Sequence, residues 1–258
     1  MTFLHILLLF IASLLGGTLN SVAGGGSFFT VPALNLTGVP LIFSNTTSTV
    51  ALWPGSVAST GAYRHELSKL NRVLLILTSA ISIIGGILGA ILLLITPQQA
   101  FASLFPFLLL MATLLFTFGK ALTSRIRKYL PSFEQKAQLS PVTMILISIM
   151  QLIISVYGGY FGGGIGILML ASLEVIGMDN IHEMNALKTL LTSFINGVAV
   201  VTFIIAGAVL WLQAIIMIIG AIIGGYGGAY FARKLNPMFV RIFVIVVGFS
   251  LTIYFFIK

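Results

Sequence analysis

Cysteine and charged residues are what this sequence lacks. Its 258 residues include no Cys, which excludes disulfides, thiolate metal sites and cysteine nucleophiles. Only 7% of the residues are charged, against about 25% in a typical soluble domain, and the mean hydropathy is +1.15. Because so few polar side chains cannot cover a globule in water, the composition predicts a polytopic membrane protein.

The charge-free runs of the sequence are long enough to cross a bilayer. No Lys, Arg, Asp or Glu occurs in 1–63, 73–119, 137–173, 189–232 or 242–257. One helical span needs about 20 apolar residues, so we expect an all-α, multi-pass protein in a lipid bilayer, with a prokaryotic plasma membrane as its location. The apolar N-terminus lacks the basic start of a signal peptide and is interpreted as a span.

The net charge of +8 does not indicate nucleic acid as a partner. The Lys and Arg residues lie mainly in short clusters between apolar runs, where they set the orientation of a membrane protein. Nucleic-acid binding would need a basic face with interleaved aromatic residues, and the sequence has none.

Motifs of catalysis and of ATP binding are also missing. The stretch HEMNA, 182–186, begins like a zinc-protease helix, but Ala186 stands where a second His is needed. Three histidines without cysteine make no metal cluster, and there is no G-x-S-x-G elbow and no Walker A loop. We therefore expect no enzyme, no cofactor and no ATPase in this chain.

Features of the first half recur about 139 residues later, in the same order. Four pairs coincide: Gly24–Gly26 with Gly162–Gly164, Gly38 with Gly177, Asn45 with Asn185, and GGILGA (85–90) with GGYGGA (224–229). Each match alone is weak, but four in register predict a duplicated unit.

Each unit is predicted to contain a helix, a glycine break, a short apolar segment, a polar elbow and three long helices. In the first unit, 1–119, these lie at 2–20, 24–26, 27–36, 37–46, 46–63, 73–95 and 101–119. In the second, 142–258, they lie at 142–160, 162–164, 165–176, 177–188, 188–206, 209–231 and 238–257. A basic cytoplasmic linker, 120–141, joins the two units.

Charge placement favours an odd number of crossings in each unit. A plain eight-span arrangement divides the Lys and Arg residues between the two sides of the membrane. If the broken segment folds back as a re-entrant hairpin, or its short arm is a full pass, every Lys and Arg except Lys258 faces one side. The positive-inside rule prefers this arrangement, and odd crossings make the two units inverted repeats.

The glycine breaks are the first candidate site. A break inside a bilayer leaves backbone N–H and C=O groups unpaired, so it persists where it lines a cavity or is buried in protein. Paired breaks at matching places in two repeats indicate a transporter's binding site, and the free N–H groups of a broken helix suit an anion. Close helix packing is the alternative role for Gly24–Gly26 and Gly162–Gly164.

Packing is the preferred role for the other glycines. Gly85 and Gly89, like Gly224 and Gly228, are four residues apart on one helix face, which is the spacing that lets two helix backbones approach closely. Gly61 and the pair at 16–17 are assigned to the same role.

The elbows supply the polar side chains. The first holds Asn45 and Thr46 within FSNTTST, and the second holds Asn185 and Lys188 within IHEMNALKT. Asn185 and Lys188 are three residues apart and share a helix face. Lys188 begins a 44-residue charge-free run, so it is a candidate functional cation, with a lysine that snorkels to the interface as the alternative. His182 and Glu183 are interpreted as a solvated pair rather than as carriers of a coupled proton.

The stretches 23–59 (AGGGSFFTVPALNLTGVPLIFSNTTSTVALWPGSVAS) and 158–196 (GGYFGGGIGILMLASLEVIGMDNIHEMNALKTLLTSFIN) resemble the two signature stretches of the TauE/SafE sulfite-exporter family of membrane permeases. The resemblance covers nearly the whole chain and implies secondary transport of sulfite or small organosulfonates. It implies these binding residues: Gly24, Gly25, Gly26, Ser27, Asn45, Thr46, Gly162, Gly163, Gly164, Asn185 and Lys188. The first elbow reads Asn-Thr-Thr where many relatives have Gly-Thr-Ser, which leaves the exact substrate open.

The sequence therefore predicts a secondary transporter with one small-anion site between two inverted repeats. Backbone N–H groups at Gly25–Ser27 and Gly163–Ile165 would hold the anion's oxygens, and Lys188 would neutralise its charge. Proton coupling is the default energy source, because no set of carboxylates typical of a Na⁺ site is visible. An anion channel and a non-transporting component of a larger membrane assembly are the alternatives.

Overall fold

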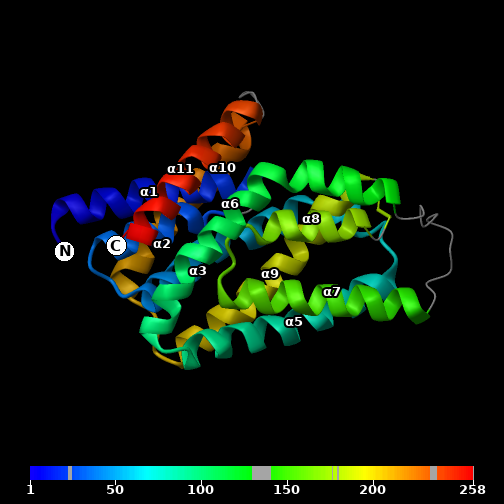
Figure 1. The fold of residues 1–258 in the computed structure, drawn as a ribbon, viewed down its shortest axis with the longest axis horizontal. Coiled ribbons are helices and arrows are strands. Elements are labelled where there is room, and N and C mark those ends of the chain that lie inside the picture. Colours follow the sequence, from blue (N-terminus) through cyan, green and yellow to red (C-terminus); the bar gives the residue numbers. More distant parts are fainter. Residues whose placement is uncertain (23–24, 130–140, 176, 179, 233–236, 258) are drawn as a thin grey trace.

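The protein is all-helical in the residues that the computed structural model describes, 1–22, 25–129, 141–175, 177–178, 180–232 and 237–257 (Figure 1). The first repeat contains α1 Phe3–Val22, α2 Ser27–Leu36, α3 Leu41–Ala62, α4 Arg64–Leu67, α5 Arg72–Ile95 and α6 Gln98–Tyr129. The second contains α7 Pro141–Tyr160, α8 Ile165–Val175, α9 Ile181–Ile205, α10 Trp211–Ala232 and α11 Pro237–Ile257. The order of long and short helices is the one predicted, with the four-residue α4 added.

Several helices are long and apolar enough to cross a bilayer. Within the described residues these are Phe3–Asn20, Arg72–Ile95, Gln98–Gly119 and Ile181–Ile205. Shorter apolar helices accompany them, including the half-length α2 and α8. The all-helical, multi-pass membrane class predicted from composition is confirmed.

The two repeats pack on each other reciprocally. Helix α1 of the first repeat packs along α10 of the second, and α7 of the second packs along α5 of the first. The equivalent helices α3 and α9 face each other, as do α6 and α11. Each repeat therefore buries its first helix against the other repeat, and neither forms a separate domain.

Helices α3 and α9, which hold the same place in the two halves of the chain, run in opposite directions. At one end of the α3–α9 pair, the Thr46 hydroxyl donates to the carbonyl of Ala208, just after α9. At the other end, the Thr60 hydroxyl donates to the carbonyl of Thr189, near the start of α9, at 3.1 Å. These contacts make α3 and α9 antiparallel, as an inverted repeat requires. The orientation of each repeat in a bilayer stays a prediction.

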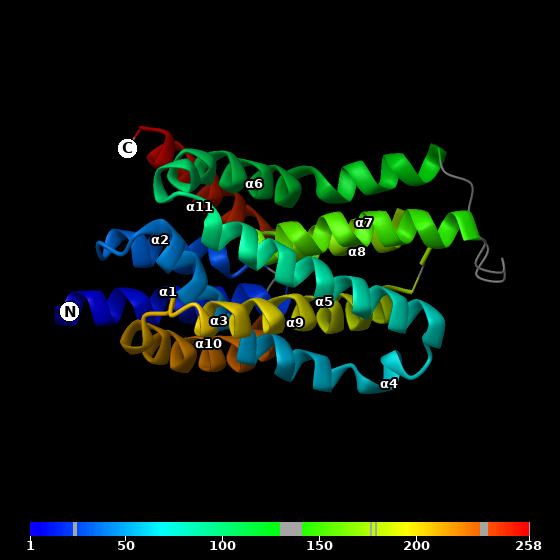
Figure 2. The same cartoon turned by 90° about the horizontal axis from the view of Figure 1, so that it is seen from below.

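The basic segments at α4 and at the end of α6 lie at the end of the molecule opposite the two termini. Figure 2 shows α1 beginning and α11 ending at one end of the molecule, while α4 lies at the opposite end with the end of α6 and the start of α7. Helix α6 continues to Tyr129, so the first ten residues of the predicted linker are helical. The remaining linker residues up to 140 lie outside the described residues.

The small-residue packing prediction is confirmed at most of its positions. A Cβ at Gly85 or Gly89 would collide with α7, and a Cβ at Gly17 or Gly224 would collide across the α1–α10 contact. At Gly61 a Cβ would meet nothing within 4 Å, so the packing role assigned to it is wrong. Gly228 falls outside the residues whose surroundings are described.

The predicted polar elbows are largely helical, which corrects their boundaries. Only short turns separate the helices, and α3 begins at Leu41 and α9 at Ile181. Gly38 (φ +89°) and Gly177 (φ +92°) close α2 and α8 with left-handed backbone that glycine adopts without strain. Asn45 and Asn185 therefore lie at the start of the second turn of a helix, where the pattern of polar residues suggested loops.

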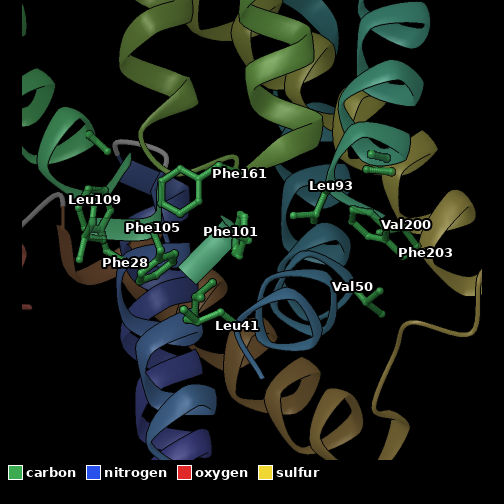
Figure 3. Close-up of a cluster of buried hydrophobic side chains, with 14 of the residues drawn as sticks. Phe28, Leu41, Val50, Leu93, Phe101, Phe105, Leu109, Phe161, Val200 and Phe203 are labelled. Atoms are coloured by element: carbon green, nitrogen blue, oxygen red, sulfur yellow. The ribbon is translucent and has the colours of Figure 1, made fainter. Parts of the chain in front are cut away.

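An aromatic core fills the space between α6 and the glycine breaks. Figure 3 shows Phe28, Phe101, Phe105 and Phe161 together within it. The Phe105 and Phe161 rings meet edge-on with their centroids 5.7 Å apart, and Phe28 meets Phe116 in the same way at 5.4 Å. This core packs both breaks on their apolar side, since Phe28 follows the first break and Phe161 precedes the second.

Candidate anion-binding pocket

The glycine breaks are conformations that other residues would resist. Gly25 has φ +134°, Gly162 φ +75° and Gly164 φ +73°, values that L side chains rarely adopt. The chain turns at each of them and starts a new short helix within a few residues. Gly24 lies outside the described residues.

Two half-length helices begin directly after the breaks. Helix α2 starts at Ser27 and α8 at Ile165, and a helix N-terminus carries unpaired N–H groups and a partial positive charge. In the described part of the chain, the N–H groups of Gly163 and Gly164 have no acceptor, whereas Ile165 N–H donates to Gly162 O at 3.3 Å. Of the predicted Gly163–Ile165 donors, the two glycines lack an acceptor among the described residues, but neither lines the pocket described next.

A pocket of about 40 Å³ lies where the two breaks meet α3 and α9. It is lined by twelve residues from five helices and the second break: Asn20, Ser27, Thr49, Leu52, Ser56, Gly162, Ile165, Gly166, Lys188, Thr189, Thr192 and Asn196. Since the first residues of α2 and α8 both line it, the pocket receives the positive ends of two helix dipoles.

Lys188 is the one formally charged residue in this lining, and its side chain is 5% exposed. Its ammonium donates to the Asn185 carboxamide oxygen at 3.0 Å. Burying a positive charge without a counter-charge is unfavourable, and the lining contains no carboxylate. The electrostatics of the pocket therefore favour an anion.

The structure brings some of the predicted site residues together and separates others. Ser27, Gly162 and Lys188 line the pocket, while Asn185 reaches it through its hydrogen bond to Lys188. Asn45 instead donates from its amide to the carbonyl of Tyr160 at 2.9 Å, which ties α3 to the end of α7. Its carboxamide oxygen is buried without a partner among the described residues.

Four other predicted residues make contacts away from the pocket lining. Thr46 donates to the carbonyls of Phe43 and Ala208. Gly163 O accepts the hydroxyl of Tyr157, and Gly164 packs against Ala112. Gly26 packs closely on Gly16, which sets the spacing between α1 and α2.

Sequence reasoning missed the uncharged polar residues on the inner faces of α3 and α9. Thr49 and Ser56 on α3, and Thr189, Thr192 and Asn196 on α9, line the pocket. Each set recurs every three, four or seven residues within an apolar helix, which is one face of that helix. Asn20, the last pocket residue before the first break, donates to the Ser56 hydroxyl at 3.1 Å.

The start of α9 is fixed by its cap. Asn180 accepts from the N–H of His182 at 3.0 Å and donates to the Glu183 carboxylate at 3.0 Å. Glu183 and the exposed His182 therefore lie in the first turn of a capped helix, outside the pocket lining. Within the described residues there is no group of three or more His, Asp or Glu that could hold a metal ion.

Helices broken by glycine at matching places in two repeats, with a polar pocket between them, are typical of membrane transporters. A protein-family model described as "Sulfite exporter TauE/SafE" matches residues 9–255. The chain therefore belongs to the sulfite exporter TauE/SafE family, as its resemblance to the signature stretches predicted.

Relatives from several bacteria match over nearly their whole length. The chain is 27% identical over 252 residues to the probable membrane transporter protein ORF9 of Sinorhizobium sp, covering 95% of this chain and 90% of that one. A probable membrane transporter protein of Haemophilus influenzae is 26% identical, with 95% and 92% covered. The probable membrane transporter protein YfcA of Escherichia coli is 23% identical, with 93% and 85% covered. No solved structure gives a significant match.

Proposed function

We propose that the protein is a secondary active transporter of small sulfur oxyanions, with its binding site in the pocket at the two glycine breaks. The observation that carries this proposal is the placement of Lys188. A buried ammonium without a carboxylate in the pocket lies with the first residues of two half-helices. An anion bound there would neutralise the ammonium at the positive ends of the two half-helices.

The size of the pocket favours a compact ligand. One water molecule needs roughly 10–15 Å³ of such space, so about 40 Å³ accommodates a ligand as large as a few water molecules. Sulfite is of this size, whereas sulfoacetate carries an additional organic arm. Sulfite is therefore the first substrate to test, with organosulfonates as the second class.

The reciprocal packing of the repeats supports alternating access. The pocket lies between α3 and α9, which belong to different repeats and run antiparallel. Rocking of one repeat against the other would open the pocket to each side of the membrane in turn, as in other transporters built from inverted repeats. The pocket lining contains no carboxylate for Na⁺, so proton coupling is the proposed energy source.

Counterflow in proteoliposomes tests this function. Proteoliposomes that contain the purified protein would be loaded with unlabelled sulfite, thiosulfate, sulfoacetate or sulfate. The same anion would then be supplied outside in labelled form, with and without an imposed pH gradient. Exchange of sulfite that responds to the gradient supports the proposal. Flux that only runs down its own gradient indicates a channel, and no flux of any of the four anions contradicts the assignment to sulfur anions.

A further inference from the structure

The hydrogen bonds around Asn185 hold its carboxamide at both ends. Its amide nitrogen donates to the carbonyl of Ile181 at 2.9 Å, one turn earlier on α9. Its oxygen accepts the ammonium of Lys188 at 3.0 Å. With the amide fixed to the helix backbone, the position of the ammonium is fixed as well.

The Asn185 carboxamide that accepts the Lys188 ammonium is neutral, and this leaves the charge of the lysine uncancelled. A lysine ammonium has three N–H donors, and Asn185 is its one acceptor among the described residues. A carboxamide is neutral, so it orients the ammonium without cancelling its charge. The remaining donors and the full positive charge stay available to a ligand in the pocket that Lys188 lines.

The equivalent residue of the first repeat makes a different contact. Asn45 donates its amide to Tyr160 O, and its buried oxygen holds no cation. Three residues further along α3, Ser48 stands where α9 has Lys188. The orientation of a cation by an asparagine is therefore a property of the second repeat alone.

We propose that Asn185 is a positioning residue, which sets the affinity for the anion by orienting the Lys188 ammonium as a neutral acceptor and without contacting the anion itself. The identity of the anion rests on the proposed function above; the orientation of Lys188 does not. A direct consequence is that high affinity for the anion requires a neutral side chain at position 185. A carboxylate of the same shape therefore lowers the affinity more than removal of the side chain does.

Two substitutions at this position separate orientation from structure. In Asn185→Ala the ammonium keeps its charge but loses its orientation, so the KM for sulfite counterflow rises roughly 5- to 30-fold with little change in Vmax. In Asn185→Asp an ion pair replaces the neutral hydrogen bond, and KM rises further than in the alanine variant. A merely structural Asn185, which holds α9 through its amide bond to Ile181, predicts lower thermal stability or Vmax in both variants without a selective rise in KM.

A double-mutant cycle gives the second criterion. If Asn185 acts through Lys188, Asn185→Ala has no effect on sulfite affinity in a Lys188→Ala background. Additive effects of the two substitutions would overturn the proposal. Asn71→Ala is the matched control, since Asn71 caps α5 through the N–H groups of Val73 and Leu74 and lies at an exposed site; it lowers thermal stability and leaves KM unchanged.

An anion-independent readout keeps the proposal separate from the proposed function. In protein labelled with ¹³C at lysine Cε, the Lys188 signal is identified by its loss in Lys188→Ala. We expect Asn185→Ala to move this signal toward that of the exposed Lys69, and Asn185→Asp to shift it by charge pairing. An unchanged Lys188 signal in both variants would overturn the proposal, whereas changed signals without any sulfite binding would contradict only the proposed function.

Discussion

The two repeats share one scaffold and differ in what they place beside the glycine breaks. In the first, the Ser48 hydroxyl is buried on α3 and lies 2.6 Å from the Thr30 hydroxyl of α2. In the second, Lys188 occupies the equivalent place on α9, and Leu168 takes the place of Thr30 on α8. The half-helix after the first break, α2, is therefore joined to α3 by a neutral hydrogen bond. Beside the second break, α9 instead places a cation at the pocket.

This difference is the reason why we propose a single site in a duplicated fold. Two symmetric half-helices supply two N-termini, but one lysine decides where the negative charge of a ligand is best neutralised.

The contacts between the helices of the two repeats also differ. The α5–α7 pair has a buried network in which Gln151 donates to Ser82 and Ser155, whereas across α1–α10 Thr18 donates to the carbonyl of Gly224.

Removing the charge of Lys188 is expected to have the largest effect, because this charge is the main difference between the two repeats at the pocket. We expect Lys188→Ala to weaken sulfite binding roughly 10- to 100-fold, as expected for loss of a charge-assisted hydrogen bond. The measurement is the KM of sulfite counterflow. Lys69→Ala is the control, because Lys69 is exposed and lies outside the pocket. Equal losses in both variants would contradict the site.

Glycine substitutions test whether the two crossed helix contacts are equivalent. A Cβ at Gly89 meets the backbone of α7, and one at Gly224 meets the backbone of α1. We expect Gly89→Ala and Gly224→Ala each to lower stability by about 1–3 kcal/mol, measured as thermal unfolding in detergent. Gly61→Ala, with open space around it, is expected to be neutral or slightly stabilising; if it unfolds the protein as readily, the packing account is wrong.

The hydrogen bonds of Gln151 distinguish the α5–α7 contact from the α1–α10 contact. Replacing Gln151 by Ala leaves the buried hydroxyls of Ser82 and Ser155 without this partner, at a cost of about 1–3 kcal/mol. Ser13→Ala in the equivalent helix α1 removes one bond from a hydroxyl to its own helix and costs less. Thermal unfolding of both variants compares them, and a larger loss at Ser13 would reverse the expected order.

The smallest effect is expected at the neutral counterpart of Lys188. Ser48→Ala removes the hydrogen bond to Thr30 and is expected to cost about 1 kcal/mol of stability. The KM for sulfite should not change, because Ser48 does not line the pocket. A rise in KM comparable to that of Lys188→Ala would mean that both repeats bind the anion.

The sequence predicts the scaffold better than it predicts the pocket. The breaks at Gly25 and Gly162 stand out because an interrupted helix in lipid leaves backbone groups unpaired, and Lys188 stands out against a charge-free run. Thr49 and Thr192 do not, because a threonine in an apolar helix ordinarily bonds its own backbone, as both do here. Gly61 was misassigned, since composition alone does not say which face of α3 meets another helix.

Helix starts were the other source of error. The polar run from Ser44 to Thr46 has the composition of a loop, yet it lies within the first two turns of α3. Its hydroxyls bond carbonyls of neighbouring connections: Ser44 donates to Val39 O and Thr46 to Ala208 O. The structure shows tertiary partners that a linear pattern does not contain. For the same reason, the separate surroundings of Asn45 and Asn185 became visible only in the fold.

The most direct test of the account is to locate the anion. Selenite has the shape and charge of sulfite and scatters anomalously, so crystals of the protein grown with selenite would show its position. The account predicts an anomalous peak within hydrogen-bond distance of the Lys188 ammonium, between the first residues of α2 and α8. A peak elsewhere in the protein, together with selenite counterflow that survives Lys188→Ala, would contradict it.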